Sequence, residues 1–383
     1  MRFGLTEDDL ALRDTARSFA HEHLAPHAVG WDRTKHFPID ALRKAASLGM
    51  GALCIPQEDG GSGLSRLQAA LIFEALATGC PAVSAYLSIH NMCTSMVERL
   101  GTVEQKHRWL PQLVSMELLS SYCLTEPGSG SDAAALRTRA VRDGGHYLVN
   151  GQKQFISGAG NPHGFYIVMA RTSDDGARGI STFVIERDSP GLGFGAEEHK
   201  MGWNAQPTRA VTFDDVRVPV ENRLGAEGEG FKIAMSALDG GRLNIAACSL
   251  GGAQAAFDKA VSYMTERKAF GQRLSDFQAL RFKVADMATE LEAARLFLYS
   301  AANAVDLDEP GKTRRVAMAK KFVTDRCFDV ANDALQLLGG YGYLSDYGIE
   351  KIVRDLRVHQ ILEGTNEIMR LIVARDIFAE HGA

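Results

Sequence analysis

The stretch QILEGTNEI, from Gln360 to Ile368, places an acid, Glu363, between aliphatic residues and a glycine. An unpaired carboxylate costs several kcal/mol to bury, so such residues are normally paired, exposed or functional. Thr365 is a good N-cap for a helix that continues through Ile368, which puts Glu363 just ahead of a helix N-terminus. The helix dipole stabilises an anion there by about 0.3–1 kcal/mol, too little to offset full burial. Glu363 therefore either serves helix-end electrostatics or lies at the mouth of an apolar pocket, where its pKa would suit a general base.

Two glycine-rich stretches combine hydroxyl groups with a flexible backbone. YCLTEPGSGSD, from Tyr122 to Asp132, predicts a loop that can approach a ligand closely. It lacks the GxGxxG pattern and a lysine, so a tight polar turn explains it as well as a phosphate loop does. QFISGAG, from Gln154 to Gly160, has an aromatic ring and a serine that would suit a flavin, but it is also typical of an ordinary strand end.

Two stretches carry arginines in unusual places. LDGGRLNIAACSLGG, from Leu238 to Gly252, predicts the start of a long helix with Asp239 as its cap. Arg242 near that start opposes the helix dipole, so we expect it to face an acid, a ligand or a surface ion-pair partner.

The stretch ERKAFGQRLSDFQ, from Glu266 to Gln278, predicts a helix break at Phe270–Gly271 with Arg267 and Arg273 nearby. Arginine suits bidentate phosphate binding, and solvated surface charge is the alternative.

Bulk composition excludes several classes of protein. Hydrophobic residues at 45% and charged residues at 23% are ordinary for a globular protein. The net charge of −5 does not indicate the positively charged surface that binds nucleic acid. We expect no membrane insertion, because no apolar run reaches spanning length. HEHLAPH lacks the HExxH spacing, and we expect no metal site.

The six scattered cysteines indicate a reducing compartment, and MRFGLTEDDL resembles no targeting peptide. We expect a bacterial cytoplasmic protein, or a mitochondrial matrix protein if the chain is a mature eukaryotic one.

The chain divides into three regions that differ in residue types and in the spacing of their apolar residues. Thr6 with the acids that follow it predicts a helix start, and helical periodicity then continues to about Leu119. Short β-branched and aromatic runs follow, with a hairpin turn predicted at Asn150–Gly151. Long helices then return, one of them ending at Gly339–Gly340. The expected fold class is α+β multidomain, with an N-terminal helical domain over 1–119, a central antiparallel β domain over 120–228 and a C-terminal antiparallel helical bundle over 229–383.

Together, in this order, these motifs resemble the acyl-CoA dehydrogenase family over the range from Leu5 to Ile377. The family has the same three-domain order. Four stretches, KMGWNAQPTRAV, GGRLNIAACSLG, LQLLGGYGYLSDYG and VRDLRVHQILEGTNEIMR, are most similar to members that oxidise isobutyryl-CoA in valine degradation.

The resemblance implies that FAD lies between the β domain and the C-terminal bundle. Glu363 matches the catalytic base. The matching cofactor positions near the isoalloxazine ring are Tyr122, Cys123, Leu124, Thr125, Glu126, Pro127, Gly128, Ser129, Gly130, Ser131, Phe155, Ile156 and Ser157. Those expected to reach FAD across a subunit interface, as in the family's homotetramers, are Arg267, Phe277, Gln278, Gln336, Leu337, Leu338, Gly339 and Gly340. Thr365, Asn366 and Glu367 match the adenosine and phosphate contacts, and the substrate positions are Ser131, Asp239, Gly240, Gly241, Arg242 and Arg375.

The implied reaction removes the α-proton of an acyl-CoA with Glu363 while the β-hydrogen leaves as hydride to flavin N5. Isobutyryl-CoA would become methacrylyl-CoA, and an electron-transfer flavoprotein would accept the electrons. Some relatives carry the base at the position of Gly241, which has no side chain here. Butyryl-CoA or 2-methylbutyryl-CoA are alternative substrates. Oxygen-dependent flavin chemistry on the same fold and a flavin-free scaffold protein are the remaining alternatives.

Overall fold

The computed structural model describes residues 4–382 and begins with a helical region. Thr6 caps the first helix as predicted, because its side chain accepts a hydrogen bond from the backbone N–H of Asp9 and the Asp9 carboxylate accepts one in return. The helices of this region are α1 (Glu7–Phe19), α2 (Ala28–Thr34), α3 (Ile39–Ser47), α4 (Arg66–Ala77), α5 (Pro81–Leu100) and α6 (Val103–Val114), and a π-helical turn, Ala20–Leu24, follows α1.

A sheet of eight strands follows, in the order β6-β7-β3-β2-β4-β5-β8, with β1 paired to β4. Its strands are β1 (Leu119–Cys123), β2 (Arg139–Asp143), β3 (His146–Ser157), β4 (Gly164–Arg171), β5 (Ile180–Glu186), β6 (Leu192–Phe194), β7 (Thr208–Pro219) and β8 (Arg223–Leu224). Most pairings are antiparallel, as expected, but β1 and β2 each pair with β4 in parallel. The sheet has its own apolar core, in which Tyr147 and Phe183 pack edge to face.

The predicted hairpin turn at Asn150–Gly151 is wrong. Strand β3 runs straight through it, and the turn between β2 and β3 lies at Gly144–Gly145 instead. Asn150–Gly151 forms a bulge where the register with β7 shifts, and Gly151 has φ +145°. Glycine is required there, because a Cβ would lie 2.7 Å from the Cα of Thr138.

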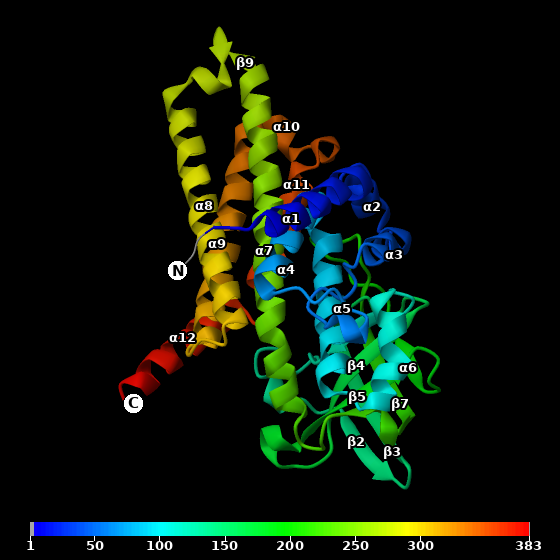
Figure 1. Ribbon diagram of the computed structural model, residues 1–383. Helices are drawn as coiled ribbons and strands as arrows, with labels where there is room; N and C mark the ends of the chain where they lie inside the picture. The colour runs from blue at the N-terminus through cyan, green and yellow to red at the C-terminus, as the bar shows by residue number, and fades with distance from the viewer. Residues whose placement is uncertain (1–3, 383) are drawn as a thin grey trace.

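The C-terminal region is a bundle built on one very long helix, α7 (Gly230–Glu266). Figure 1 shows α7 running from the strands at one end of the molecule to β9 at the other, with α8 beside it and α12 projecting from the bundle. The remaining elements are β9 (Lys268–Ala269), β10 (Gln272–Arg273), α8 (Gln278–Asp306), α9 (Lys312–Leu338), α10 (Gly340–Tyr343), α11 (Ile349–Arg357) and α12 (Asn366–Glu380).

Local signals predicted a few of the ends of these helices. The break at Phe270–Gly271 and the end of α9 before Gly339 are confirmed, and Phe270 and Gly339 both have positive φ. The expectation that Asp239 caps the start of a helix is wrong. Helix α7 begins nine residues earlier at Gly230, so Asp239 lies in its interior.

The N-terminal and C-terminal helices share one apolar core, and α7 packs against α4, α5 and α9. The crossing of α7 with α4 is very close, since a Cβ on Gly251 would lie 2.0 Å from the carbonyl oxygen of Glu74. Within the described part of the chain, no helix combines the length and the apolar character needed to cross a membrane.

We expect Gly251→Ala to lower the free energy of unfolding by about 1–3 kcal/mol, because the added methyl group must push α7 away from α4. Gly30→Ala is the matched control: Gly30 is a helical glycine with no heavy atom within 4 Å of its would-be Cβ, and it should not lose stability. Urea unfolding monitored by circular dichroism measures both. Equal stability of the two variants would contradict the close crossing.

Candidate active site

Glu363 lies in a short segment between the 3-10 turn Val358–Gln360 and helix α12. Thr365 caps α12 as predicted, accepting a hydrogen bond from the backbone N–H of Ile368. Glu363 has φ +57° and Gly364 has φ +89°. A glutamate whose backbone lies in the left-handed region is uncommon, and this conformation costs on the order of 1–3 kcal/mol. The surrounding contacts must therefore hold the backbone in place.

The Glu363 carboxylate is pressed against helix α7 at Gly241. A Cβ on Gly241 would lie 2.6 Å from Oε2 of Glu363, so a side chain there would force the carboxylate to move. Although the residue as a whole is only partly covered, Oε2 is buried and makes no hydrogen bond with any residue in 4–382. Burial raises the pKa of Glu363 to about 7, against the opposing effects of Arg242 and Lys320.

Arg242 and Lys320 hold the backbone that directly follows the Glu363 side chain. Arg242 Nε donates to the carbonyl oxygen of Glu363 at 3.1 Å, and its Nη1 pairs with Asp239 at 2.8 Å. Lys320 is fully buried, and its Nζ donates at 2.9 Å to the carbonyl oxygen of Gly364 and at 2.9 Å to Oδ1 of Asn366. Burial lowers the pKa of Lys320 to about 7.

The carboxylate faces a cavity of about 300 Å³, which we name the Glu363 cleft. The cleft lies between the β domain, α5 and the first half of α7. Its lining residues are Ile89, Met92, Tyr122, Leu124, Thr125, Gly130, Ser131, Asp132, Ala133, Ala134, Phe155, Ile156, Ser157, Trp203, Phe231, Met235, Leu238, Arg242, Leu362, Glu363, Gly364 and Ile368. Apolar walls with a few polar groups that converge on one carboxylate are typical of an enzyme active site.

Much of the predicted flavin loop lines this cleft, and the rest supports it. Within the loop, Thr125 contributes to the wall, whereas Glu126 points away from it. The Glu126 carboxylate pairs with the buried Lys153 at 2.7 Å and accepts the backbone N–H groups of Arg137 and Thr138 at 2.6 and 2.9 Å. Ser129 donates to the carbonyl oxygen of Asp132 at 2.6 Å. Cys123 belongs to the core of the sheet, and Pro127 and Gly128 are likewise not among the lining residues.

The end of β3 completes the wall with an aromatic ring and a hydroxyl. Phe155 has φ +59° and is 63% exposed, which is unusual for a large apolar side chain. The register with β7 shifts just before Ile156, and this shift turns Phe155, Ile156 and Ser157 toward the cleft. An exposed ring beside the Thr125 and Ser157 hydroxyls fits a flat heteroaromatic group such as a flavin.

A second group of predicted cofactor residues gathers in a different hollow. This hollow of about 670 Å³ is lined by Arg267 and the segment 336–340, and within residues 4–382 it shares no lining residue with the Glu363 cleft. Phe277 lies near it, packing edge-on against Phe270. Gln278 begins α8 beside it.

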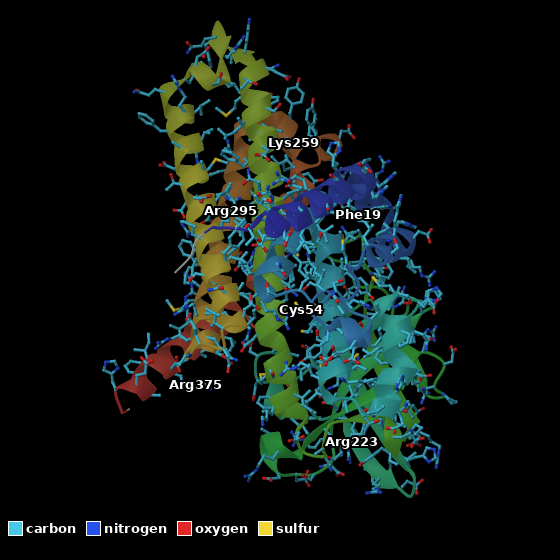
Figure 2. The ribbon with its side chains drawn as sticks, in the orientation of Figure 1. Phe19, Cys54, Arg223, Lys259, Arg295 and Arg375 are labelled. Atoms are coloured by element: carbon cyan, nitrogen blue, oxygen red, sulfur yellow. The ribbon has the colours of Figure 1, made fainter. Side chains whose placement is uncertain are left out.

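The other predicted residues lie outside the cleft. Asn366 is buried and bonds Lys320 and Asp325, while Glu367 is exposed and pairs with Arg370. Gly240 and Gly241 line a separate hollow on another face of α7. Arg375 is exposed on α12, the helix that projects from the bundle (Figure 2).

Sequence analysis missed Lys320 and Trp203. Lys320 follows Val316 and precedes Val323 on the buried stripe of α9, and a lysine on an apolar stripe was a usable signal. Trp203 reaches the cleft from a loop, where its Nε1 donates to Nε2 of His359 at 3.2 Å and its backbone N–H donates to Asp355 at 2.6 Å. Trp203 belongs to KMGWNAQPTRAV, a stretch that supported the family resemblance, but no signal in that stretch indicated a place in the site.

Three family models match the chain in succession. They describe the N-terminal, middle and C-terminal domains of acyl-CoA dehydrogenase and cover residues 6–117, 121–216 and 228–378. The chain belongs to the acyl-CoA dehydrogenase family. It therefore has the family fold and is a flavin-dependent oxidoreductase that acts on the CH–CH bond of an acyl-CoA. The family uses FAD.

Individual relatives are similar over nearly the whole chain. Mitochondrial isobutyryl-CoA dehydrogenase of Dictyostelium discoideum is 53% identical over 375 residues, which are 98% of this chain and 90% of the relative. The Bos taurus enzyme of the same name is 52% identical over 377 residues, with the same coverage of 98% and 90%. The structure of butyryl-CoA dehydrogenase from Megasphaera elsdenii matches with a TM-score of 0.95 at 37% identity, covering 99% of this chain and 100% of that one.

The raised pKa of Glu363 predicts a pH-dependent gain of stability in Glu363→Gln. Between the usual value of 4.5 and about 7 the folded protein holds a proton that the unfolded chain has lost, so this group lowers stability as pH rises through that window. At pH 8 the Gln variant should be more stable by an amount on the order of 1–3 kcal/mol, and the gain should shrink toward pH 4.5.

Denaturant unfolding of both proteins across this pH range measures the difference. Glu117→Gln changes an exposed glutamate and should show no such trend. A Gln variant that loses stability as pH rises, relative to the parent protein, would contradict the burial of the carboxylate.

Proposed function

We propose that this member of the family oxidises isobutyryl-CoA to methacrylyl-CoA, with Glu363 as the base that removes the α-proton. The identity of 52–53% to isobutyryl-CoA dehydrogenases over 98% of the chain supports the substrate. The Glu363 carboxylate supports the chemistry, because it faces the cleft with a pKa near 7 and Oε2 bonds no described residue. A base with a pKa near the working pH transfers protons most effectively.

The walls around Glu363 suit a small alkyl acyl group. Ile89, Met92 and Leu362 are apolar and line the cleft with the carboxylate, so they exclude water from it. Arg242 is the one cationic side chain among the described lining residues, and Asp239 and the Glu363 carbonyl already engage it. No cation is left there to neutralise a second carboxylate, which argues against a dicarboxylyl-CoA.

Each residue of the site has a defined task in this proposal. FAD, when bound against Thr125, Phe155 and Ser157, would accept the β-hydrogen as hydride. The Arg242 side chain holds the base in position by donating a hydrogen bond to the backbone carbonyl oxygen of Glu363. The backbone N–H of Glu363 bonds no group in the described chain and is free to donate to the thioester carbonyl, whose oxygen gains negative charge as the α-proton leaves.

The experiment that tests this function is an anaerobic titration of the purified flavoenzyme, followed by the absorbance of oxidised flavin. Isobutyryl-CoA should bleach the flavin stoichiometrically, and butyryl-CoA and 2-methylbutyryl-CoA should do so much less. Glu363→Gln should retain FAD and lose roughly 10²–10⁴-fold in the rate of bleaching, in line with the removal of a general base. Preferential bleaching by butyryl-CoA would keep the family and reject the branched substrate, while near-normal bleaching in the Gln variant would reject Glu363 as the base.

We also propose that the enzyme is a homotetramer and passes its electrons to an electron-transfer flavoprotein. The hollow around Arg267 and residues 336–340 would contact FAD held mainly by another subunit, because it is separate from the Glu363 cleft of its own chain. Large apolar side chains at that end, Phe270 at 97% and Tyr343 at 82% exposure, are suited to a subunit contact.

Light scattering after size-exclusion chromatography should give four chains per particle. Gln336→Ala should lower the FAD retained through gel filtration, while a change at the distant Gln112, which is exposed on α6, should not. A monomer that keeps its FAD would contradict the shared site.

A further inference from the structure

A second hollow, of about 260 Å³, lies against a different face of α7 from the Glu363 cleft. Phe231, Met235, Leu238 and Arg242 line the cleft, whereas the second hollow takes Lys232, Ser236, Gly240 and Asn244 from the same helix. Each set recurs every three or four residues, so the two sets follow two separate faces of α7. The hollow is completed by Arg66 of α4 and by Arg99 and neighbouring residues of α5.

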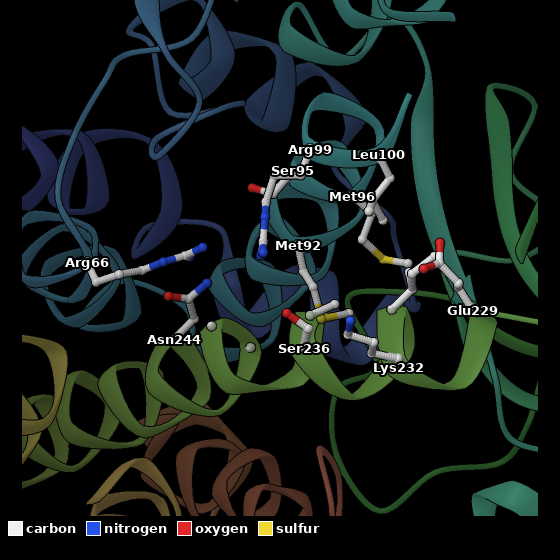
Figure 3. Close-up of a pocket in the computed structure, with 14 residues that line it drawn as sticks. Arg66, Met92, Ser95, Met96, Arg99, Leu100, Glu229, Lys232, Ser236 and Asn244 are labelled. Atoms are coloured by element: carbon white, nitrogen blue, oxygen red, sulfur yellow. The ribbon is translucent and has the colours of Figure 1, made fainter. Parts of the chain in front are cut away.

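Three cationic side chains, those of Arg66, Arg99 and Lys232, stand among the apolar and polar residues that line this hollow. Figure 3 shows Arg66 and Arg99 pointing into it from two sides, with Asn244 pointing up from α7 between them. Within residues 4–382, the head groups of Arg66, Arg99 and Lys232 form no ion pair and no hydrogen bond. The single carboxylate on the walls, Glu229, accepts a hydrogen bond from the backbone N–H of Ala226 at 3.1 Å. The hollow therefore carries a net positive charge that no described side chain balances.

The floor of the hollow holds a polar group with no described partner. Asn244 is 3% exposed, and its amide forms no hydrogen bond with any residue that the structure describes. Buried amides are nearly always hydrogen-bonded, so the Asn244 amide has donor and acceptor groups available to a ligand seated in the hollow. Gly240 makes room beside it, because a Cβ there would lie 2.8 Å from Nη1 of Arg66.

We propose that this hollow is a phosphate-binding site, distinct from the Glu363 cleft although Met92 lines both. Two guanidinium groups can each offer paired N–H donors to a phosphate, and a lysine and an amide add further donors. Several cations around one small space favour a dianion over a single carboxylate. The volume is below the roughly 300–1,000 Å³ of sites for drug-sized ligands, which favours a small phosphate or one phosphate group of a larger molecule such as coenzyme A.

Isothermal titration of the purified flavoenzyme with inorganic phosphate, in a phosphate-free buffer, tests the site. Saturable binding of one phosphate per chain is expected. Arg66→Gln, Arg99→Gln and Asn244→Leu should each weaken it at least tenfold. Arg142→Gln, which removes an exposed arginine of β2, should bind phosphate as the parent protein does.

A repeat titration in the presence of saturating desulfo-coenzyme A separates the two sources of phosphate. Unchanged phosphate binding would assign the site to a small free phosphate, and displacement would assign it to a phosphate of coenzyme A. Absence of saturable binding, or equal affinity in the parent protein and the Arg66 and Arg99 variants, would overturn the proposal. Flavin reduction by isobutyryl-CoA, measured on the same proteins, reports the proposed function separately.

Discussion

The whole site depends on two cations that bind the backbone next to a carboxylate and leave the carboxylate itself free. Arg242 and Lys320 donate to the carbonyl oxygens of Glu363 and Gly364, not to the acid between them. A direct ion pair would lower the pKa of Glu363 and make it a weak base. Because neither cation bonds the carboxylate, the effect of burial outweighs theirs and the pKa rises to about 7. The same two side chains thus fix the position of the acid and leave it able to take up a proton.

That arrangement brings the carboxylate against helix α7. The left-handed backbone of Glu363 turns its carboxylate back onto α7 at Gly241, where an added side chain would force the carboxylate to move. A further glycine, Gly251, lets α4 cross α7 at close range. The position of Gly241 relative to the acid is therefore set by the packing of α7 against the N-terminal helices. This links the global packing of the protein to the geometry of its proposed base.

The features that sequence analysis predicted correctly are those determined by neighbours in the chain. Only a few adjacent residues determine the Thr6 and Thr365 caps and the break at Phe270–Gly271. The sequence alone therefore predicts them. Asn150–Gly151 carries an equally strong local signal, yet contact with a neighbouring strand makes it a bulge. The stretch that contains Gly240–Gly241 also carried a local signal, for the start of a helix, and long-range packing again gave it a different role. Its glycines instead serve close approaches, one to Arg66 and one to Glu363.

The site shows the same division between local and long-range information. Glu363 could be singled out because an acid beside a helix start in an apolar stretch is locally anomalous. Lys320 acts on it from 43 positions earlier in the chain, and Trp203 reaches the cleft from the β domain by bonding Asp355 and His359. Such contacts exist only once the domains have packed.

The separate hollow around Arg267 and residues 336–340 extends this reasoning beyond one chain. Its residues matched the family's cofactor positions, yet its own chain places them in a hollow that has no described lining residue in common with the Glu363 cleft. In the proposed tetramer, a cofactor that contacts both regions would lie between two subunits. In that case folding alone leaves the site incomplete, and assembly supplies the remaining contacts.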